Sequence, residues 1–260
     1  MPEYSAFEMI AFTGSRQLED KKIVFVGTGL PIIAAMHAQL THAPNLYMIY
    51  EAGSLAPILE IGMPLSVGDT RAGRKACYLK GLCAVFELTQ RGFADYAFIG
   101  GAQIDMYGNI NSTMIGEDYL HPKVRLPGSG GANDFASLAW KTLSIVPHDR
   151  RKFVSHVDFI TSPGYINGPG AREAAGLPPG TGPYKVISTL AVMGFDTHSK
   201  RMCVESLHPG VDRADIEANT GFNMLCADQL PVTAEPTDEE LEILRHEVDP
   251  QGMIIGKWAT

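Results

Sequence analysis

The sequence predicts an α/β fold in which an open, mostly parallel sheet is flanked by helices. A wholly apolar run, Ile23–Val26, is followed by the glycine turn Gly27-Thr28-Gly29, by a helix-compatible stretch and by a second apolar run that ends at Glu51. This order is that of a βαβ unit. The first run is too apolar for a sheet with one wet face, which predicts a strand covered on both sides.

Local patterns predict the other elements in order. Helices are expected at residues 6–18, from Pro31 to about residue 40, and at residues 82–92. Two short surface helices, 212–219 and 238–247, carry their acids in the first turn. Apolar runs rich in β-branched and aromatic residues predict strands at 46–50, 95–99, 142–146, 157–161, 185–193 and 202–205.

Two stretches resist such an assignment. Residues 55–75 are interrupted by prolines, and 162–183 form a long segment rich in glycine and proline. A loop of the second length is usually functional, an interface or mobile. With 260 residues, of which 45% are hydrophobic, the chain is long enough for a continuous core. No linker justifies a cut, so one domain over residues 1–260 is expected.

Composition excludes several classes of protein. A formal net charge of -8 disfavours nucleic acid as a partner, because phosphate binding needs clustered Lys and Arg. No basic leader and no apolar run of membrane-spanning length is visible, which predicts a cytoplasmic protein without a membrane partner. The eight histidines are scattered, so no metal site is expected. The four cysteines, which lack pairing density and Cys-x-x-Cys spacing, are interpreted as reduced core thiols: Cys77, Cys83, Cys203 and Cys226.

Glu51 is the first candidate functional residue. It ends the apolar run of residues 46–50 and is followed by Gly53-Ser54, so it lies at the carboxyl tip of a predicted buried strand. In open α/β sheets this edge lines the ligand-binding crevice. Most Glu side chains are simply solvated, however, and the residues alone leave both interpretations open.

Gly27 and Gly29 offer the first two glycines of a dinucleotide fingerprint, with Glu51 where a ribose-binding carboxylate would stand. Ile32 occupies the position that the fingerprint keeps small for the third glycine. A lone Gly-x-Gly is weak evidence. The alternative is that both glycines only allow a tight turn into the helix.

Glycines also interrupt the chain at two later points. Gly100-Gly101 follows the predicted strand 95–99, and a turn is expected at residues 106–109, so a ligand could approach the backbone there. Residues 128–133, Gly-Ser-Gly-Gly-Ala-Asn, lead into a helix-compatible stretch. Unpaired amides before a helix can bind anions or developing oxyanions. The alternative is a flexible loop capped by Asn133. The stretch is neither a Walker A loop nor, around Ser129, a nucleophile elbow.

Several blocks, in order along most of the chain, carry a resemblance to a known family. They are Val26-Gly27-Thr28-Gly29-Leu30-Pro31, Glu51-Ala52-Gly53, Ser66-Val67-Gly68-Asp69, Phe98-Ile99-Gly100-Gly101-Ala102-Gln103-Ile104-Asp105, Tyr107-Gly108-Asn109, Gly128-Ser129-Gly130-Gly131-Ala132-Asn133, Thr161-Ser162-Pro163-Gly164 and Asn219-Thr220-Gly221-Phe222. The chain resembles the β subunit of class I coenzyme A transferases, whose fold is NagB-RpiA-like. Many members read Ser-Glu-Asn-Gly where Tyr50-Glu51-Ala52-Gly53 stands here, which points toward the glutaconate-type branch and leaves the acyl specificity open.

The resemblance implies roles for individual residues. Glu51 matches the family's catalytic glutamate, a nucleophile that forms a glutamyl-CoA thioester, and Gly130 and Gly131 match its oxyanion-binding glycines. Expected contacts to substrate or CoA, from the remaining blocks, are Gly27, Gly29, Gly100, Gly101, Gln103 and Asn133. The implied reaction moves CoA between an acyl-CoA and a free dicarboxylic or other carboxylic acid. A CoA thioester is the substrate, and no permanently bound cofactor and no metal are implied.

The resemblance covers only one of the two halves that form such a site, so it implies a separate α subunit and a hetero-oligomer of αβ units. Two alternatives stay open. The scaffold could serve acyl-CoA hydrolysis, ring opening or decarboxylation, with Glu51 as a base or bystander. Alternatively, the chain could be non-catalytic and bind only a ligand or a partner. The sequence assigns no role to Asp69, Gln103, Asp105 or Asn109.

Overall fold

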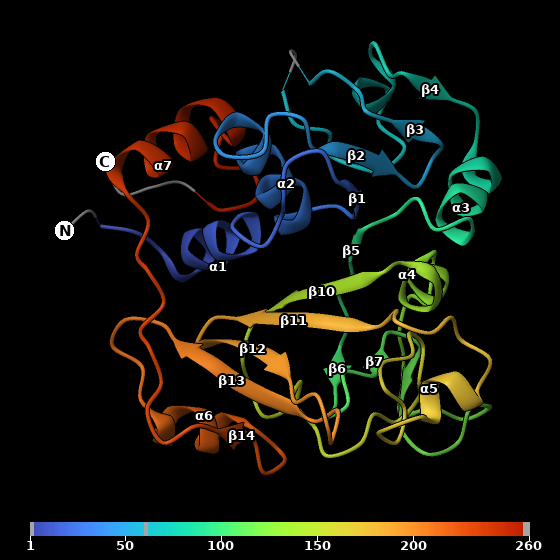
Figure 1. Cartoon of the computed structure of the whole chain (residues 1–260), viewed down its shortest axis with the longest axis vertical. Helices are drawn as coiled ribbons and strands as arrows, with labels where there is room; N and C mark the ends of the chain where they lie inside the picture. Colours follow the sequence, from blue (N-terminus) through green and yellow to red (C-terminus); the bar gives the residue numbers. More distant parts are fainter. Residues whose placement is uncertain (1–2, 60–61, 257–260) are drawn as a thin grey trace. The chain divides into compact units, whose positions relative to one another are not determined.

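The structure is a computed structural model that describes residues 3–59 and 62–256. The chain forms two compact units, unit 1 with Met1–Phe98 and Glu235–Thr260, and unit 2 with Ile99–Ala234. Each unit combines strands with helices (Figure 1), as expected for the predicted α/β class. The prediction of one domain over residues 1–260 stays a prediction.

The described residues of unit 1 form five strands in the order β5-β1-β2-β3-β4. The central strand β1 (Ile23–Val26) pairs in parallel with β2 (Tyr47–Tyr50) and with β5 (Tyr96–Phe98). These three predicted strands are confirmed, and they are almost wholly buried. The antiparallel strands β3 (Ser54–Leu55) and β4 (Tyr78–Leu79) extend the sheet beyond β2. Two residues are too few to give a periodic signal, so the sequence did not predict them.

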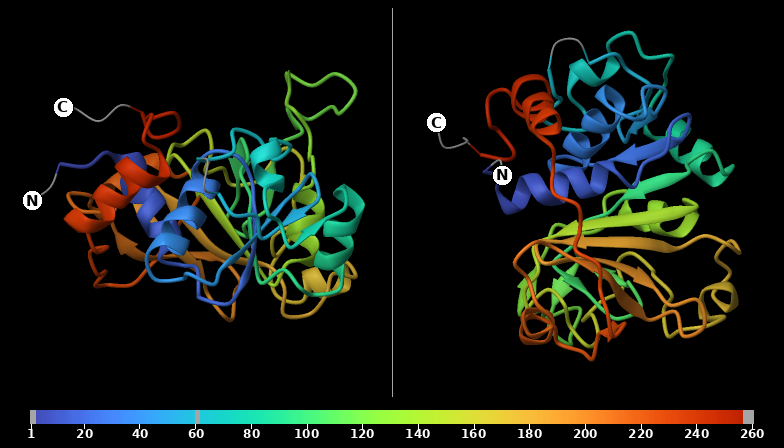
Figure 2. Two further views of the ribbon diagram at one scale, coloured as in Figure 1. Left: turned by 90° about the horizontal axis from the view of Figure 1, so that it is seen from above. Right: turned by 60° about the vertical axis from the view of Figure 1, so that its left-hand side comes forward.

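Helices cover the sheet of unit 1. Helix α1 (Ala6–Ser15) begins with a capping box between Ser5 and Glu8 and packs against α2 (Leu30–Leu40), as Figure 2 also shows. Pro31 stands in the first turn of α2, as predicted. The remaining helices of this unit, as described, are η1 (Thr70–Gly73), α3 (Leu82–Gln90), α7 (Asp238–Ile243) and the π-helix η2 (Leu244–Val248).

The returning segment of the chain is fixed to α1 by two ion pairs. Arg16 binds Glu240 at 2.7 Å, and Arg245 binds the buried Glu8 at 2.7 Å. Helix α7 and η2 also pack on α2. Residues from the two ends of the sequence therefore form one core.

Unit 2 contains the strands β14-β13-β12-β11-β10. Strand β10 (Lys141–Val146) runs parallel to β11 (Pro183–Ser188), and β12 (Ala191–Phe195) and β13 (Met202–Leu207) follow antiparallel. The predicted strand 185–193 is therefore wrong as one element, since a turn divides it into β11 and β12. The other elements of this group are α6 (Arg213–Asn219), which confirms a predicted helix, and β14 (Leu225–Cys226), which is parallel to β13.

Shorter elements complete unit 2. They are the pairs β6 (Gln103–Ile104) with β7 (Ile110–Asn111) and β8 (Met114–Ile115) with β9 (Val124–Arg125), and the helices α4 (Ala132–Leu138) and α5 (Ala171–Ala174). The predicted strand 157–161 is wrong. Its apolar side chains Phe159 and Ile160 are exposed, and the bridge between Ser162 and Ile110 lies one residue beyond its end. Tertiary context overrides β-propensity here.

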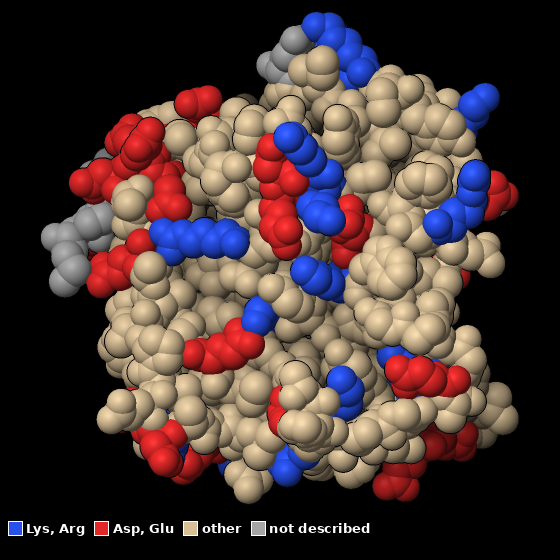
Figure 3. All heavy atoms as spheres, in the orientation of Figure 1, with Lys and Arg blue, Asp and Glu red and all other residues tan. Residues whose placement is uncertain are grey.

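The surface agrees with the composition. Acidic and basic side chains are interspersed on the face drawn in Figure 3.

All four cysteines are free, but Cys77 and Cys83 are exposed and Cys203 and Cys226 half-buried, so their interpretation as core thiols is wrong. Within residues 3–59 and 62–256, each helix is too short or too polar to cross a bilayer.

Candidate functional site

Glu51 and Gly27 leave the sheet of unit 1 side by side. Val26 and Tyr50 are paired in the parallel register of β1 and β2, so the next residue of each strand emerges at the same carboxyl edge. Glu51 is half-buried, and its carboxylate has no hydrogen-bond or ion-pair partner among the described residues. A carboxylate that is partly shielded from water and free of partners is available to react with a ligand.

The turn after Glu51 is fixed by close backbone packing. The amide of Gly53 donates to the carbonyl of Tyr50 at 2.9 Å, and Lys80 donates to the carbonyl of Gly53 at 3.1 Å. Gly53 has φ +117°, and a Cβ on it would lie 2.4 Å from the Cα of Gly81. Tyr50 anchors the other side, since its ring is fully buried and burial raises the pKa of its hydroxyl.

Gly27 and Gly29 face open space. A Cβ on either residue would meet nothing within 4 Å, so nothing in the fold crowds these glycines. Gly29 is the N-cap of α2 with φ +81°, and it makes no side-chain cap. Ile32, at the third fingerprint position, is completely buried. The turn thus has room for a ligand, although it lacks the third small residue that dinucleotide binding uses.

In unit 2 the glycine loop before α4 is anchored at its start. The amide of Gly128 donates to the carbonyl of Ser112 at 2.8 Å, and the Ser112 hydroxyl donates back to the Gly128 carbonyl at 2.9 Å. Gly130 is exposed with φ +49°, and the buried Gly131 is the N-cap of α4. The structure gives the amides of Gly130 and Gly131 no acceptor within residues 99–234. These two donors are therefore free to bind an anionic group.

Asn133 does not cap the helix, so the alternative of a loop capped by this residue is wrong. The cap position belongs to Gly131, two residues earlier. The side-chain amide of Asn133 instead donates to the carbonyl of Thr161 at 3.0 Å. Asn133 thereby ties the first turn of α4 to the segment that precedes the glycine- and proline-rich stretch.

Gly101 and Gln103 are packed against the hairpin partner strand β7. A Cβ on Gly101 would lie 2.2 Å from Cγ2 of Ile110, whereas one on the exposed Gly100 would meet nothing within 4 Å. Gln103 is buried, and its Oε1 accepts hydrogen bonds from the side chain of Asn111 at 2.7 Å and from the amide of Asp158 at 3.0 Å.

Asn111, Ser112 and Thr161 join the predicted residues of unit 2, although sequence reasoning missed them as site residues. Thr161 accepts from the amide of Ser112 at 2.9 Å, and its hydroxyl lies 3.5 Å from Oδ1 of Asn111. A chain of contacts therefore runs from Gln103 through these residues to Asn133. The polar run of residues 111–113 directly after the apolar Ile110 was the available signal.

The acids and amides without an assigned role turn out to shape loops. Asp105 is buried and accepts from the amide of Tyr107 and from the side chain of Asn109, while burial raises the pKa of its carboxyl. Asn109 in turn accepts from the amides of Gly164 and Ile166. In unit 1, Asp69 caps η1, and its hydrogen bonds to Arg71 hold the pKa of its carboxyl below the usual value.

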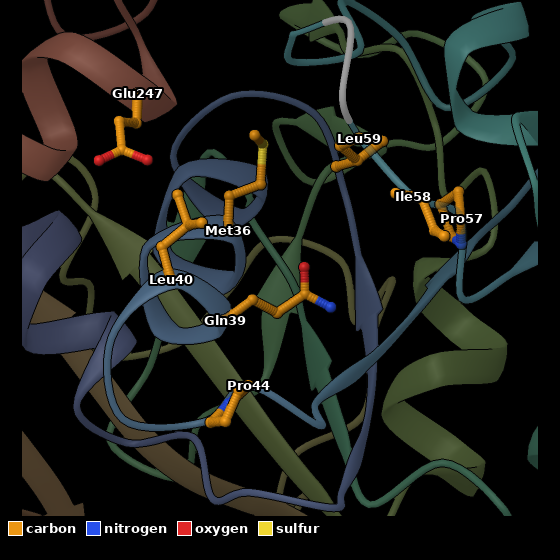
Figure 4. Close-up of a pocket in the computed structure, with 8 residues that line it drawn as sticks. All are labelled: Met36, Gln39, Leu40, Pro44, Pro57, Ile58, Leu59 and Glu247. Atoms are coloured by element: carbon orange, nitrogen blue, oxygen red, sulfur yellow. The ribbon is translucent and has the colours of Figure 1, made fainter.

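The structure brings no three His, Cys, Asp or Glu side chains together in a metal-binding group within the described ranges. A pocket of about 510 Å³ lies elsewhere in unit 1 (Figure 4), between the end of α2 and the segment after β3. Its lining is mainly apolar: Met36, Gln39, Leu40, Pro44, Pro57, Ile58, Leu59 and Glu247. Because β3 is antiparallel to β2, residues after β3 run back toward the amino end of β2, away from Glu51.

Comparisons with known proteins identify the family of the chain. The family model described as coenzyme A transferase matches residues 7–219. One of the subunits of glutaconate CoA-transferase from Acidaminococcus fermentans is 40% identical over 252 residues, 95% of this chain and 93% of the relative. One of the subunits of 3-oxoadipate CoA-transferase from Pseudomonas knackmussii is 42% identical over 246 residues, 94% of each chain. A chain of the crystal structure of glutaconate coenzyme A-transferase from Acidaminococcus fermentans matches with a TM-score of 0.92 and 36% identity, covering 98% of this chain and 99% of that one.

Proposed function

The chain belongs to the coenzyme A transferase family, and from that premise we propose that it is the catalytic β subunit of a two-subunit CoA-transferase. One observation carries the proposal: the half-buried, unpartnered carboxylate of Glu51 at the carboxyl edge of the unit 1 sheet. Both relatives described above are named for a dicarboxylic acid. A dicarboxylic acid and its CoA thioester are accordingly the proposed substrate class.

The proposed reaction begins with Glu51 as nucleophile. Its carboxylate oxygen attacks the thioester carbonyl of the acyl-CoA, the carbon–sulfur bond breaks, and CoA leaves as the thiolate with a mixed anhydride left on the enzyme. The thiolate then attacks the glutamyl carbonyl of that anhydride and releases the first acid. The acceptor carboxylate repeats both steps in reverse, which yields the new acyl-CoA and restores the Glu51 carboxylate.

Each addition places negative charge on a former carbonyl oxygen. We assign the amides of Gly130 and Gly131 as the donors for this oxyanion, since neither has an acceptor among the described residues. A well-placed oxyanion donor contributes about 3 kcal/mol to the transition state. No acid or base is needed at these positions, so glycine amides suffice.

Substrate and CoA contacts are assigned to residues with open backbone. Gly27, Gly29 and Gly100 meet nothing where a side chain would stand, which supports close approach of a ligand. Gly101 and Gln103 hold the loop beside β7, and the exposed Asn133 holds the first turn of α4, so any ligand contact of theirs adds to a structural one.

We further propose that the site is completed by a separate α subunit and that the enzyme is a cytoplasmic hetero-oligomer of αβ units. The chain matches, over nearly its whole length, relatives that are each named as one of the subunits of a CoA-transferase. Such relatives act on CoA thioesters, and the proposed steps require no resident cofactor. The isolated chain should therefore be inactive, with activity appearing when the α subunit is added.

Borohydride trapping tests the proposal. The reconstituted complex is treated with acyl-CoA and then borohydride, and the peptides are analysed by mass spectrometry. A glutamyl thioester is reduced to the alcohol, so the Glu51 peptide should lose one oxygen and gain hydrogens. Glu51→Gln is the matched control and should show neither trapping nor transfer. Transfer by Glu51→Gln at the wild-type rate would refute the assignment, and hydrolysis or decarboxylation without trapping would favour the other enzyme classes.

A further inference from the structure

Arg172 is the least exposed charged side chain in the described part of the chain, at 1%. It lies in the short helix α5, inside the glycine- and proline-rich stretch 162–183. Burying a cation is expensive unless its donors are all bound. The contacts of its guanidinium group therefore show what the fold gains from it.

The guanidinium binds neutral oxygens from three segments. Nη1 donates to the carbonyls of Pro163 and Gly164 at 2.9 and 3.0 Å. Nη2 donates to the carbonyls of Ala136 and Ser137 at 2.6 and 3.2 Å. Nε and Nη2 donate to the hydroxyl of Thr181 at 3.2 and 3.0 Å.

No carboxylate forms an ion pair with Arg172 among the described residues. Burial lowers the pKa of its guanidinium from the usual value, yet an arginine remains charged. Hydrophobic packing at this position would avoid the desolvation cost of the charge. The geometry that the rigid fork imposes on its acceptors is what an apolar side chain could not supply.

Two of the acceptors place Arg172 at the carboxyl end of α4. Ala136 and Ser137 belong to the last turn of this helix, which begins directly after Gly131. Seven residues of helix span about 10 Å, so a shift at one end is carried to the other. The opposite end is tied by side chains at two points, Asn133 to the carbonyl of Thr161 and Ser112 to the carbonyl of Gly128.

We propose that Arg172 is a positioning residue: by fixing the end of α4 it holds the Gly130 and Gly131 amides where they act on the reacting carbonyl. This inference rests on the proposed function. It assigns to the stretch 162–183 a role in aligning the reaction centre. Arg172 itself does not touch substrate in this assignment.

Two substitutions test it in the reconstituted αβ complex. Arg172→Lys keeps the charge but removes the fork. Thr181→Val removes the hydroxyl that accepts two of the hydrogen bonds from Arg172, whereas the control Thr181→Ser keeps this hydroxyl. Misplaced oxyanion donors slow catalysis, so kcat should fall about 10- to 100-fold in Arg172→Lys and less in Thr181→Val, with KM for acyl-CoA within about twofold.

The matched control is Arg213→Lys, because Arg213 also donates to a backbone carbonyl of unit 2, that of Ala227, but lies on α6. Its kcat should stay at the wild-type value, and so should that of Thr181→Ser. Hydrogen exchange at the bonded amides of Ala132 and Phe135, which donate to the carbonyls of Ser129 and Gly131, should be faster in Arg172→Lys and Thr181→Val at a temperature where all variants are folded.

Other results would overturn the inference. If Arg172→Lys and Thr181→Val lower the melting temperature while kcat of the folded complex is unchanged, Arg172 is structural only. If Arg172→Lys does not fold, an unchanged kcat in Thr181→Val has the same meaning. Failure of the proposed function is distinguishable, since transfer would then persist in Glu51→Gln and no Glu51 adduct would be trapped in the wild-type complex.

Discussion

Gly53 and Gly81 lie in direct backbone contact, so close that a methyl group on Gly53 would stand 2.4 Å from the Cα of Gly81. Gly53 also has φ +117°, a conformation that side chains rarely adopt. Gly53 follows Glu51 by two residues, so this contact holds the turn that presents Glu51. The position of the proposed nucleophile thus depends on two residues without side chains.

Gly53→Ala should therefore displace this turn. We expect more than about 1 kcal/mol loss in the free energy of unfolding and a large loss of transfer activity. Urea unfolding and steady-state rates of the αβ complex measure the two effects. Gly68→Ala is the control, since Gly68 lacks a positive φ and a Cβ there would meet only the Ser66 hydroxyl, at 3.9 Å. Equal behaviour of the two variants would contradict the role of the contact.

Glu51→Asp should retain a carboxylate but withdraw it by one methylene. A nucleophile displaced by about 1 Å loses on the order of 100-fold in rate, so kcat should fall by that factor while the fold is unchanged. The thioester on the shortened side chain at position 51 should still be trapped by borohydride, although more slowly than in the wild type. A wild-type kcat in Glu51→Asp would argue that this carboxylate does not react.

Asn109→Ala should destabilise the chain. This side chain is 1% exposed and makes four hydrogen bonds, two with Ile166, one from Gly164 and one to Asp105. Its removal leaves buried groups unpaired, at a cost of about 3 kcal/mol in the free energy of unfolding. Chemical denaturation measures the loss. Asn219→Ala, which removes one surface hydrogen bond to the Asp215 carbonyl, should cost less than about 1 kcal/mol.

His148 should make the protein sensitive to acid. Its ring stacks on Phe153, and its two nitrogens lie 2.8 Å from the Ser188 hydroxyl and 3.1 Å from that of Thr220. Burial lowers the pKa of His148 to about 4 from 6.5. The unfolded chain therefore binds a proton more readily, and stability is lost as pH falls from 6.5 toward 4.

The expected loss from this one residue between pH 7.5 and 4.5 is about 2 to 3 kcal/mol. His148→Gln should be less stable than the wild type at pH 7.5 but should lose less stability on acidification, by about that amount. Urea unfolding at both pH values measures it. The exposed His198, replaced by Gln, should leave the wild-type pH dependence in place. Identical pH dependence in His148→Gln and wild type would exclude His148 as the cause.

Local sequence patterns predicted those parts of the fold and of the candidate site that a few neighbouring residues determine. The apolar strand β1, the glycine turn after it and the carboxylate at the end of β2 are each encoded within a few residues, and their common sheet edge follows from parallel pairing. The tie between Asn133 and Thr161 spans 28 residues, and that between Gln103 and Asp158 spans 55. Such contacts depend on how loops pack, which periodicity does not describe.

Arg172 shows the same limit. In the sequence it stands between Ala171 and Glu173 in a glycine-rich stretch, where a basic side chain is normally exposed to solvent. Packing against α4, the loop at Pro163 and Thr181 makes it a buried residue. The exposed Phe159 and Ile160 are the opposite case, since an apolar run predicted a strand and tertiary structure left it uncovered.

The return of the chain to unit 1 at Glu235 bears on synthesis at the ribosome. Residues up to Phe98 emerge first, yet α7 and η2, which cover α2, follow only after all of unit 2 has been translated. At about 5 to 20 residues per second this delay lasts roughly 7 to 30 seconds. During this delay the apolar face of α2 lacks the two helices that cover it in the folded protein. We therefore expect the nascent unit 1 to expose apolar surface to which chaperones bind.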